Sequence, residues 1–450
     1  MGQRLALSMA LGAVLTLSGC MDAPVLSGLS DVKPVAFVRD KVGAIGTGTA
    51  DVDPDAPALT AAADGTGSEV IADLISRRSV LEPGSNYATL ASALLDTSSG
   101  VAQAELRAAK MRAVARDKNW LPTIGPSISL NSLGELAAGL ILDQVIYDNG
   151  KRKAERAFAA ADVEVSAVAL TQDANDRVYE GLMLLVTASE ANAKAEMAER
   201  GLGRMREFNR VVTERVRGGV SSLSDQRVVR TKITTMEQEV ATHREARDAA
   251  EAELRSMAGG YDVSRMSQAV GLRLPSSDLE PLTVIRAQAE AKRTRAEAEV
   301  ERAGLLPSLS ASTILGQKDS SDITYGGAAT LGLGTSAEMA ASTARADAAD
   351  AAVQRAREEA ERTRARFESR LAALTRQERD VAEIAQQSRA NYRLFQDQFD
   401  AGKKTVMDVL SVYEQMVRDE LQHIDIKYEI VLTQLEAARL AGALANGVEI

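Results

Sequence analysis

The 450-residue chain has few of the residues from which catalytic and metal sites are usually built. It contains one Cys and two His, and aromatic residues make up 3% of the total. One Cys excludes a disulfide within the chain, and so few Cys and His leave no cluster that could hold zinc. No nucleotide-binding loop is found either. We therefore expect neither an enzyme nor a bound cofactor or metal.

A surplus of basic residues is also lacking. Lys and Arg number 53 against 63 Asp and Glu, so the net charge is −10. Nucleic-acid binding requires clustered surplus Lys and Arg, and this balance argues against such a partner. What the sequence has in quantity is aliphatic: 45% of its residues are hydrophobic, and Leu, Val, Ala and Met carry nearly all of the apolar surface.

Residues 1–19 have the features of a secretory signal peptide. Arg4 supplies a short positive region, and the apolar segment Leu5–Leu17 is about 13 residues long, too short to span a bilayer. It ends in Leu-Ser-Gly-Cys at residues 17–20, which resembles a bacterial lipobox. The resemblance implies cleavage before Cys20 and a lipid on that residue; an incidental Cys is the alternative. Met21 resembles the default signal for sorting to the outer membrane.

The next segment, residues 20–86, differs in composition from the rest of the chain. Five of the ten prolines fall here, together with several glycines. Proline removes a backbone donor, and glycine raises the entropic cost of ordering. We expect an extended, partly disordered leader behind the lipid anchor, with a short helix near Val70–Arg77.

Beyond the leader, apolar residues recur at alternating spacings of three and four. One series runs back from Phe399 to Phe367 without Pro or Gly, and another runs from Leu421 to Leu435. This spacing gives a helix a narrow apolar seam for packing against another helix, as in a coiled coil. Periodicity alone is equally compatible with a soluble coiled-coil rod.

Short segments with strand-like alternation interrupt the helices. Thr123–Asn131 alternates aliphatic residues with Ser and Thr and is followed by the apolar run Leu140–Asp148; Ser308–Leu315 alternates in the same way before the Gly-rich run Ile323–Gly334. Each strand would be about nine to eleven residues long, enough for a tilted transmembrane strand. Four strands cannot hide their edges alone, so several protomers would have to close one shared barrel.

The same landmarks occur twice along the chain. Pro122 and Pro307 are 185 residues apart, and three further pairs have separations of 184, 183 and 183: Gly150 and Gly334, Gly219 and Gly402, Asp225 and Asp408. Such constant offsets indicate an internal duplication, with repeats at residues 87–265 and 266–450. Each repeat would consist of two strands, a long helix, a tight Gly turn and a returning helix.

Helix lengths predict how the repeats pack. The stretches 150–219 and 334–402 would each form a helix of about 100 Å. The returning path of the first repeat is broken by Gly and Pro between 258 and 281, so helices Ser222–Met257 and Leu282–Gly304 would stack end to end along its long helix. In the second repeat we expect Val406–Leu444 and Ser99–Lys118 to form the corresponding stack.

The duplication, the Leu-Pro strand pairs and the segments "DQVIYDNGKRKAE" and "AGKKTVMDVL" resemble the TolC family of outer-membrane efflux factors over roughly residues 85–445. The resemblance implies a mainly α protein with a small membrane β part: a homotrimer with four strands per protomer in a 12-stranded barrel, and a long periplasmic α-helical coiled-coil tunnel. Tyr147 and Tyr325 are the candidates for an aromatic girdle.

The family resemblance also implies a function and partners. The protein would be a passive exit duct, lipid-anchored in the bacterial outer membrane, for a tripartite efflux pump or a type I secretion system. Its partners would be a periplasmic adaptor and an inner-membrane transporter of the antiporter or ABC type. The alternative that the helix pattern leaves open is a structural periplasmic coiled-coil lipoprotein that conducts nothing.

Two helix starts are the candidate site. Ser222-x-x-Asp225 and Thr405-x-x-Asp408 fit capping boxes, and capping with the helix dipole would by itself account for both aspartates. The resemblance adds that Asp408 lines the constricted tunnel entrance, where three copies would form an acidic ring. It also implies that Lys404 pairs with an acid near Asp225 and holds the entrance shut. It places the tip turns at Gly219 and Gly402, and the barrel-to-helix junctions at Gly150 and Gly334.

Overall fold

A computed structural model describes the chain from residue 67 to residue 450, apart from residues 99, 131–135, 260–278, 316–323 and 329–331. The chain divides into two units, residues 1–54 and 55–450, and the fold below is that of the second. The predicted signal peptide, Cys20 and the leader up to residue 66 lie outside the described residues, as does the predicted repeat boundary at 265/266.

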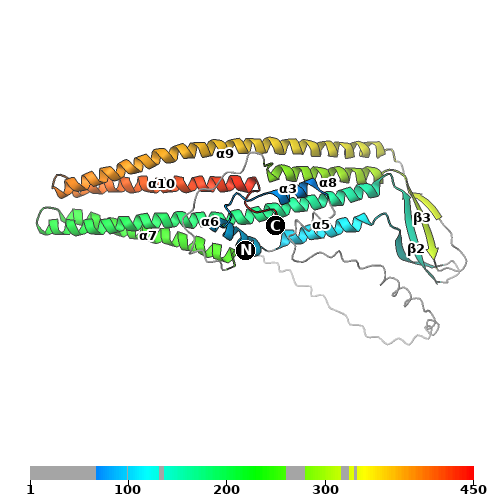
Figure 1. The fold of residues 1–450 in the computed structure, drawn as a ribbon, viewed down its shortest axis with the longest axis horizontal. Coiled ribbons are helices and arrows are strands. Elements are labelled where there is room, and N and C mark those ends of the chain that lie inside the picture. The colour runs from blue at the N-terminus through cyan, green and yellow to red at the C-terminus, as the bar shows by residue number, and fades with distance from the viewer. Residues whose placement is uncertain (1–66, 99, 131–135, 260–278, 316–323, 329–331) are drawn as a thin grey trace, which may run out of the picture. The chain divides into compact units, whose positions relative to one another are not determined.

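Two long helices dominate the second unit. α6 (Lys151–Arg217) and α9 (Thr335–Asp400) have 67 and 66 residues, and each turns back into a 35-residue helix, α7 (Leu223–Met257) or α10 (Val406–Leu440). The hairpins lie side by side, with their turns at one end and the strands at the other (Figure 1). The predicted long helices are confirmed. α10 is shorter than predicted because Gly442 takes a positive φ of 66° and the chain turns back there.

The sheet-side half of α6 is covered by α8 (Leu282–Gly304), so α7 and α8 follow one another along α6 as predicted. The prediction for the second repeat is wrong. α5 (Val101–Asp117) packs against α6, and the place beside α9 is taken by α8. The reason is that α8 buries small side chains on several faces and so accommodates a long helix on each side, whereas α5 buries only Leu106 and Ala109.

Four antiparallel strands form one sheet in chain order: β1 (Thr123–Leu130), β2 (Leu136–Tyr147), β3 (Ser308–Leu315) and β4 (Thr324–Ala328). The pairing of β2 with β3 joins the two repeats, with Leu140 opposite Leu315 and an irregularity between Val145 and Tyr147. The four predicted strands are confirmed, although β2 begins earlier and β4 is only five residues long. β1 and β4 are the two edges.

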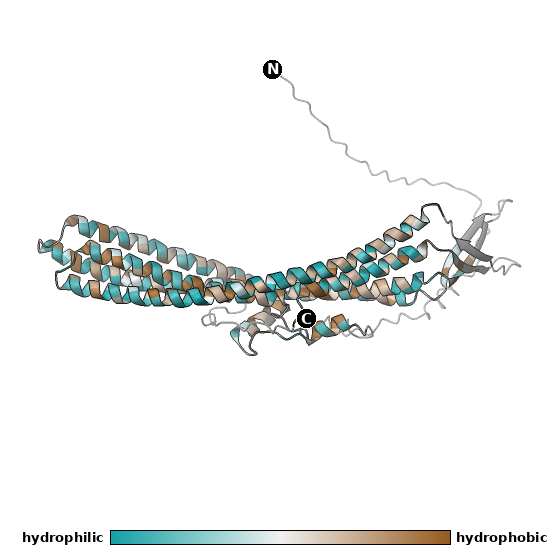
Figure 2. Cartoon of the chain, turned by 90° about the horizontal axis from the view of Figure 1, so that it is seen from above, coloured by the Kyte–Doolittle hydropathy of each residue, from teal (hydrophilic) through white to brown (hydrophobic). Residues whose placement is uncertain are grey.

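Two hydrophobic clusters hold the helices together. In the tip half, α6, α7, α9 and α10 surround a cluster that includes the ring pairs Phe208–Phe399 and Tyr392–Tyr413, with centroids 5.0 and 5.2 Å apart. Every residue of the apolar series predicted in α9 is buried or half-buried, which confirms the coiled-coil seam. The other cluster lies toward the sheet, and polar residues cover the outer helix faces (Figure 2).

The end of the predicted leader is folded rather than extended. The short helix near residues 70–77 is confirmed as α3 (Glu69–Ser76), and a further helix, α4 (Asn86–Asp96), follows; both pack against α6. Arg77 is 2% exposed and donates to the carbonyl oxygens of Ala441 and Glu280, both at 2.6 Å. Residues 67–86 therefore form part of the core, because apolar side chains within this Pro- and Gly-rich segment cover α6.

Candidate functional site at the helical tip

The two tip turns are built alike. Gly219 and Gly402 have φ angles of 73° and 75°, a conformation that favours glycine. After each glycine the next amide donates back into the long helix, from Val220 to the Arg215 carbonyl and from Lys403 to the Gln398 carbonyl, both at 2.8 Å. These are the capping bonds of a helix that ends in a left-handed glycine. The duplication seen in the sequence thus extends to individual hydrogen bonds.

Both capping boxes are present. The Asp225 amide donates to the Ser222 hydroxyl at 3.1 Å, and the Ser222 amide donates to the Asp225 carboxylate at 3.2 Å. The same two bonds between Thr405 and Asp408 measure 3.2 and 2.9 Å. The Thr405 amide, then its hydroxyl and the nearby Lys404, hold the pKa of Asp408 below its usual range. Asp408 is therefore a charged carboxylate on the tip at neutral pH.

Lys404 and Asp225 are not brought together. No ion pair joins them within the described chain; the Lys404 ammonium instead lies 4.6 Å from the centre of the Phe395 ring, a cation–π contact. Asp225 is engaged in its capping box. The closing pair implied by the family resemblance is thus not formed inside one copy of this chain.

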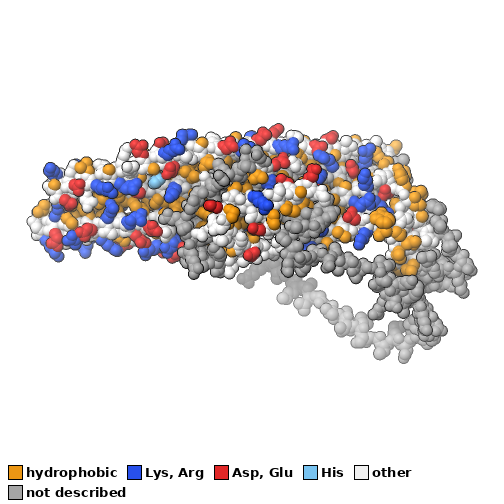
Figure 3. Space-filling view, in the orientation of Figure 1, with side chains coloured by type: hydrophobic (Ala, Val, Ile, Leu, Met, Phe, Trp, Pro, Cys, Tyr) orange, Lys and Arg blue, Asp and Glu red, His pale blue; other side chains and the backbone are white. Residues whose placement is uncertain are grey.

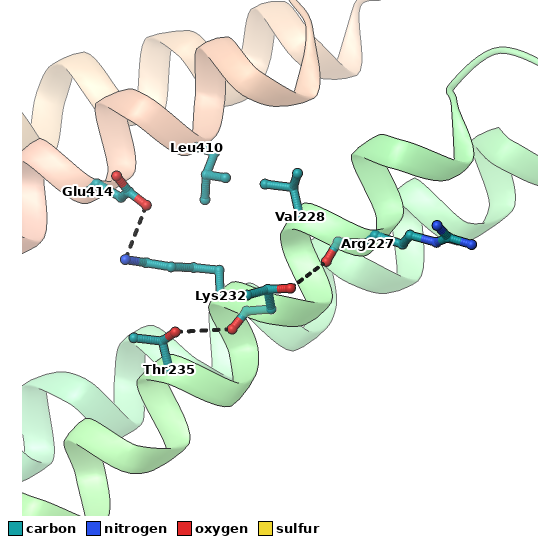
Figure 4. Close-up of a pocket in the computed structure, with 7 residues that line it drawn as sticks. Arg227, Val228, Lys232, Thr235, Leu410 and Glu414 are labelled. Carbon is teal, nitrogen blue, oxygen red and sulfur yellow. Dashed lines mark hydrogen bonds and ion pairs between the residues drawn. The ribbon is translucent and has the colours of Figure 1, made fainter.

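A different ion pair connects the two hairpins near the tip. The Lys232 ammonium on α7 lies 3.1 Å from the Glu414 carboxylate on α10, and both side chains are partly shielded, at 25% and 35% exposure. They line a groove of about 350 Å³ in which Val228 and Leu410 face each other across the two helices (Figure 4). The remaining lining residues are Arg227, Thr231 and Thr235. Lys232 and Glu414 follow the capping aspartates by seven and six residues, but this spacing does not predict that the two side chains meet.

Two further contacts fix the hairpins to each other in the tip half. The Arg215 guanidinium lies 3.9 Å from the centre of the Phe399 ring and donates to the Phe399 carbonyl at 2.6 Å, which ties the end of α6 to the end of α9. Tyr413 on α10 is buried against Gly201 of α6, and its hydroxyl is without a hydrogen-bond partner among the described residues. The tip is therefore a packed four-helix end; farther along α10, Asp419 is buried and accepts a hydrogen bond from the Gln415 side chain at 2.7 Å.

The two predicted junctions between sheet and helix differ. Gly150 has a φ of 85°, and the Asp148 carboxylate accepts hydrogen bonds from the amides of Gly150 and Arg152, both at 3.0 Å. Gly334 precedes α9 in the ordinary helical region, with a φ of −84°. A positive φ is therefore required at only one of the two junctions.

The described residues contain no group of three or more His, Cys, Asp or Glu placed to hold a metal ion. None of the helices in the described part of the chain has both the length and the apolar character needed to cross a membrane.

Comparison with known proteins finds one matching family model and several solved structures with a similar fold. Residues 100–260 match the family model described as outer membrane efflux protein, and no curated protein matches the chain. Similar solved structures include a membrane protein from Pseudomonas aeruginosa (TM-score 0.71, 16% identity, covering 83% of this chain and 93% of that one). They also include the outer membrane protein VceC from Vibrio cholerae (0.68, 15%, 80% and 97%) and the Neisseria gonorrhoeae MtrE outer membrane channel (0.66, 16%, 80% and 90%). The match over residues 100–260 makes this part of the chain similar to the outer membrane efflux proteins, and the solved structures show that the chain has a TolC-like fold.

Proposed function

We propose that the protein is a passive exit duct in the bacterial outer membrane that serves a tripartite efflux pump. The observation that carries the proposal is the open sheet at one end of two helical hairpins about 100 Å long. β1 and β4 each have a free edge, and edges within a bilayer must be paired. Three copies would close their edges into one barrel, with the hairpins continuing the bore into the periplasm.

Side chains in β3 fit a barrel wall. Ser308, Ser310 and Ser312 alternate with Leu309, Ala311 and Thr313, so one face of the strand is hydroxylic and the other mostly aliphatic. A water-filled lumen favours the hydroxylic face, and lipid favours the aliphatic one. The alternative, a structural coiled-coil lipoprotein that conducts nothing, would not require a sheet with one hydroxylic and one aliphatic face.

At the other end, the tip would be the tunnel entrance. Three copies of Asp408 would give it a negative charge that attracts cations. The groove between α7 and α10 would change when the hairpins separate, because the Lys232–Glu414 pair spans it. We propose that docking of a periplasmic adaptor at the tip drives this separation, with an inner-membrane transporter supplying the energy. Lys404 and Asp225 flank the same entrance, and their pairing would have to be made between chains. A lipid on Cys20 would anchor each protomer beside the barrel.

Planar-bilayer recordings of the full-length, processed protein test the duct and its entrance. We expect discrete channels that prefer cations. Lys232→Gln, which removes the ion pair across the groove, should raise the single-channel conductance, whereas Arg230→Gln, which changes an exposed cation of the same helix outside that pair, should not. Protein that has demonstrably inserted into the bilayer but stays electrically silent would contradict the proposal and favour the structural alternative.

A further inference from the structure

The sheet end of the first repeat exposes an unusual set of large side chains. Trp120, the only tryptophan in the chain, is 61% exposed, and Tyr147 at the end of β2 is 60% exposed. Aliphatic side chains nearby in the sequence are exposed as well: Leu121, Ile124 and Ile146. Figure 3 shows hydrophobic side chains gathered toward the sheet end, with Lys and Arg beside them. Exposed apolar groups next to polar ones mark an interaction surface.

Unpaired lysines surround these rings. Lys118, Lys151 and Lys153 are exposed and have no ion-pair partner among the described residues. The neighbouring arginines, by contrast, are paired: Arg112 with Asp162, Arg116 with Glu155 and Arg152 with Asp148. The surface is therefore locally cationic on a chain whose net charge is −10.

Hydrogen bonds hold this region in one place. The Asn119 side chain donates to the Arg152 carbonyl at 3.1 Å and accepts from the Arg156 guanidinium at 2.8 Å, which fixes the end of α5 to the first turn of α6. The Gln144 side chain donates to the Trp120 carbonyl at 3.1 Å and fixes that residue to β2. The aromatic rings and the lysines therefore belong to a single preformed surface.

The second repeat provides an internal control. At the offsets of 184 and 185, Lys118 corresponds to Ala303, Trp120 to Leu305, and Lys151 and Lys153 to Thr335 and Ala337. Both repeats run from a helix through two strands into a long helix, so this order of elements does not require Lys or Trp there. The cationic aromatic surface is thus an addition to the fold in one repeat.

We infer that Lys118, Trp120, Tyr147, Lys151 and Lys153 form a collar that binds the phosphate groups of anionic phospholipids at the periplasmic surface of the outer membrane. Trp and Tyr prefer the boundary between headgroups and acyl chains, and lysine stems extend over apolar surface while the ammonium groups reach phosphate. The inference rests on the proposed membrane placement of the sheet. It specifies which lipid contacts the duct, and through which repeat.

The single tryptophan makes the collar directly measurable. Full-length protein is reconstituted into vesicles of phosphatidylcholine alone or with phosphatidylglycerol, and quenching by lipids brominated along the acyl chain reports the depth of Trp120. We expect shallow quenching in both vesicles, because the indole lies at the interface. Phosphatidylglycerol retained in detergent is counted by native mass spectrometry. The variant Lys118→Gln/Lys151→Gln/Lys153→Gln should bind this lipid on the order of tenfold more weakly.

A matched variant with the same loss of charge, Arg230→Gln/Arg376→Gln/Lys427→Gln, changes exposed cations on α7, α9 and α10 and should retain normal binding. Equal phosphatidylglycerol binding by the two variants, with normal channels and normal quenching, would overturn the collar alone. Absence of both Trp120 quenching and channels in the unaltered protein would instead overturn the membrane placement itself.

Discussion

The two long helices occupy equivalent places in the two repeats but have opposite surroundings. α6 and α9 differ in length by one residue, yet α6 buries 26 of its 67 residues and α9 only seven of its 66. α6 is covered by α3, α4, α5, α7, α8 and α10, whereas α9 contacts chiefly α8 and α10. Duplication thus supplied two similar helices, of which one became the interior of the protomer. The other keeps an outer face, with Ile384 and Leu394 about half exposed, that neighbouring protomers would cover.

The largest effect on stability is expected at Arg77, which anchors α3, one of the helices that cover α6. Arg77→Ala removes the buried guanidinium that bonds to the carbonyls of Ala441 and Glu280, and leaves both carbonyls without that donor. We expect a loss of about 3 kcal/mol in the free energy of unfolding. Arg78→Ala, which removes the exposed neighbouring arginine, should change it little. Denaturant unfolding followed by circular dichroism measures both; equal stability would show that α3 is not anchored through Arg77.

A smaller loss of stability is expected from adding a methyl group at Gly201 of α6, where the Tyr413 side chain packs. A methyl group on Gly201 would lie 2.3 Å from the Tyr413 hydroxyl oxygen. Gly201→Ala should therefore destabilise the protein by about 1–3 kcal/mol. Counted back from the tip glycines, the residue of α9 in the place of Gly201 is the exposed Ile384, and Ile384→Ala should have little effect on the protomer.

The variant Tyr413→Phe tests whether contact with the Tyr413 hydroxyl causes the destabilisation by Gly201→Ala. Tyr413→Phe removes a buried hydroxyl that has no hydrogen-bond partner among the described residues, and leaves the ring carbon at an ordinary 3.6 Å from the added methyl group. In Tyr413→Phe, Gly201→Ala should cost less, because only the end of the flexible Met236 side chain, 2.8 Å from the added methyl group, then has to move. If the cost of Gly201→Ala is the same in both backgrounds, the clash with the hydroxyl is not its cause.

At the sheet junctions the two repeats should respond differently to the same substitution. Gly150→Ala places an alanine at a φ of 85° and should cost about 1–2 kcal/mol, whereas Gly334→Ala meets an ordinary helical φ and open space. We expect the second change to be neutral or slightly stabilising. Melting temperatures in the same detergent compare the two, and equal shifts would contradict the asymmetry.

The smallest effect is expected on the cation preference of the entrance, where Asp408 is compared with Asp225. Because the pKa of Asp408 is lowered in the folded protein, its carboxylate contributes stability above the ordinary Asp range and loses it as the pH falls through the lowered value. Cation preference should therefore persist at pH 5 and weaken only below about pH 4. Asp408→Asn should reduce it at neutral pH more than Asp225→Asn does. Reversal potentials in asymmetric salt measure this, and equal effects would mean that Asp408 has no special position.

Much of the fold follows from local signals in the sequence. Gly219, Gly402 and the two capping boxes fix where the hairpins turn, because each acts within a few residues. Apart from its short helix near Val70–Arg77, the folded end of the leader does not follow from composition, because composition averages over a segment in which a few apolar residues decide the outcome. The partner of α5 and the Lys232–Glu414 pair could not be predicted, since both depend on how hairpins distant in sequence are rotated against each other. Trp120 had a local signal, as the only tryptophan beside a predicted strand.

The central claim, that sheet edges close between copies of the chain, is tested most directly by cross-linking β1 to β4. Full-length protein carrying Ile124→Cys in β1 and Gly326→Cys in β4, with Cys20→Ser so that no third thiol is present, is purified in detergent and treated with a short reagent that bridges two thiols. If the edges meet between protomers, covalent dimers and trimers form, and neither single substitution produces trimers. Protein that stays monomeric after complete modification of both thiols would contradict the account.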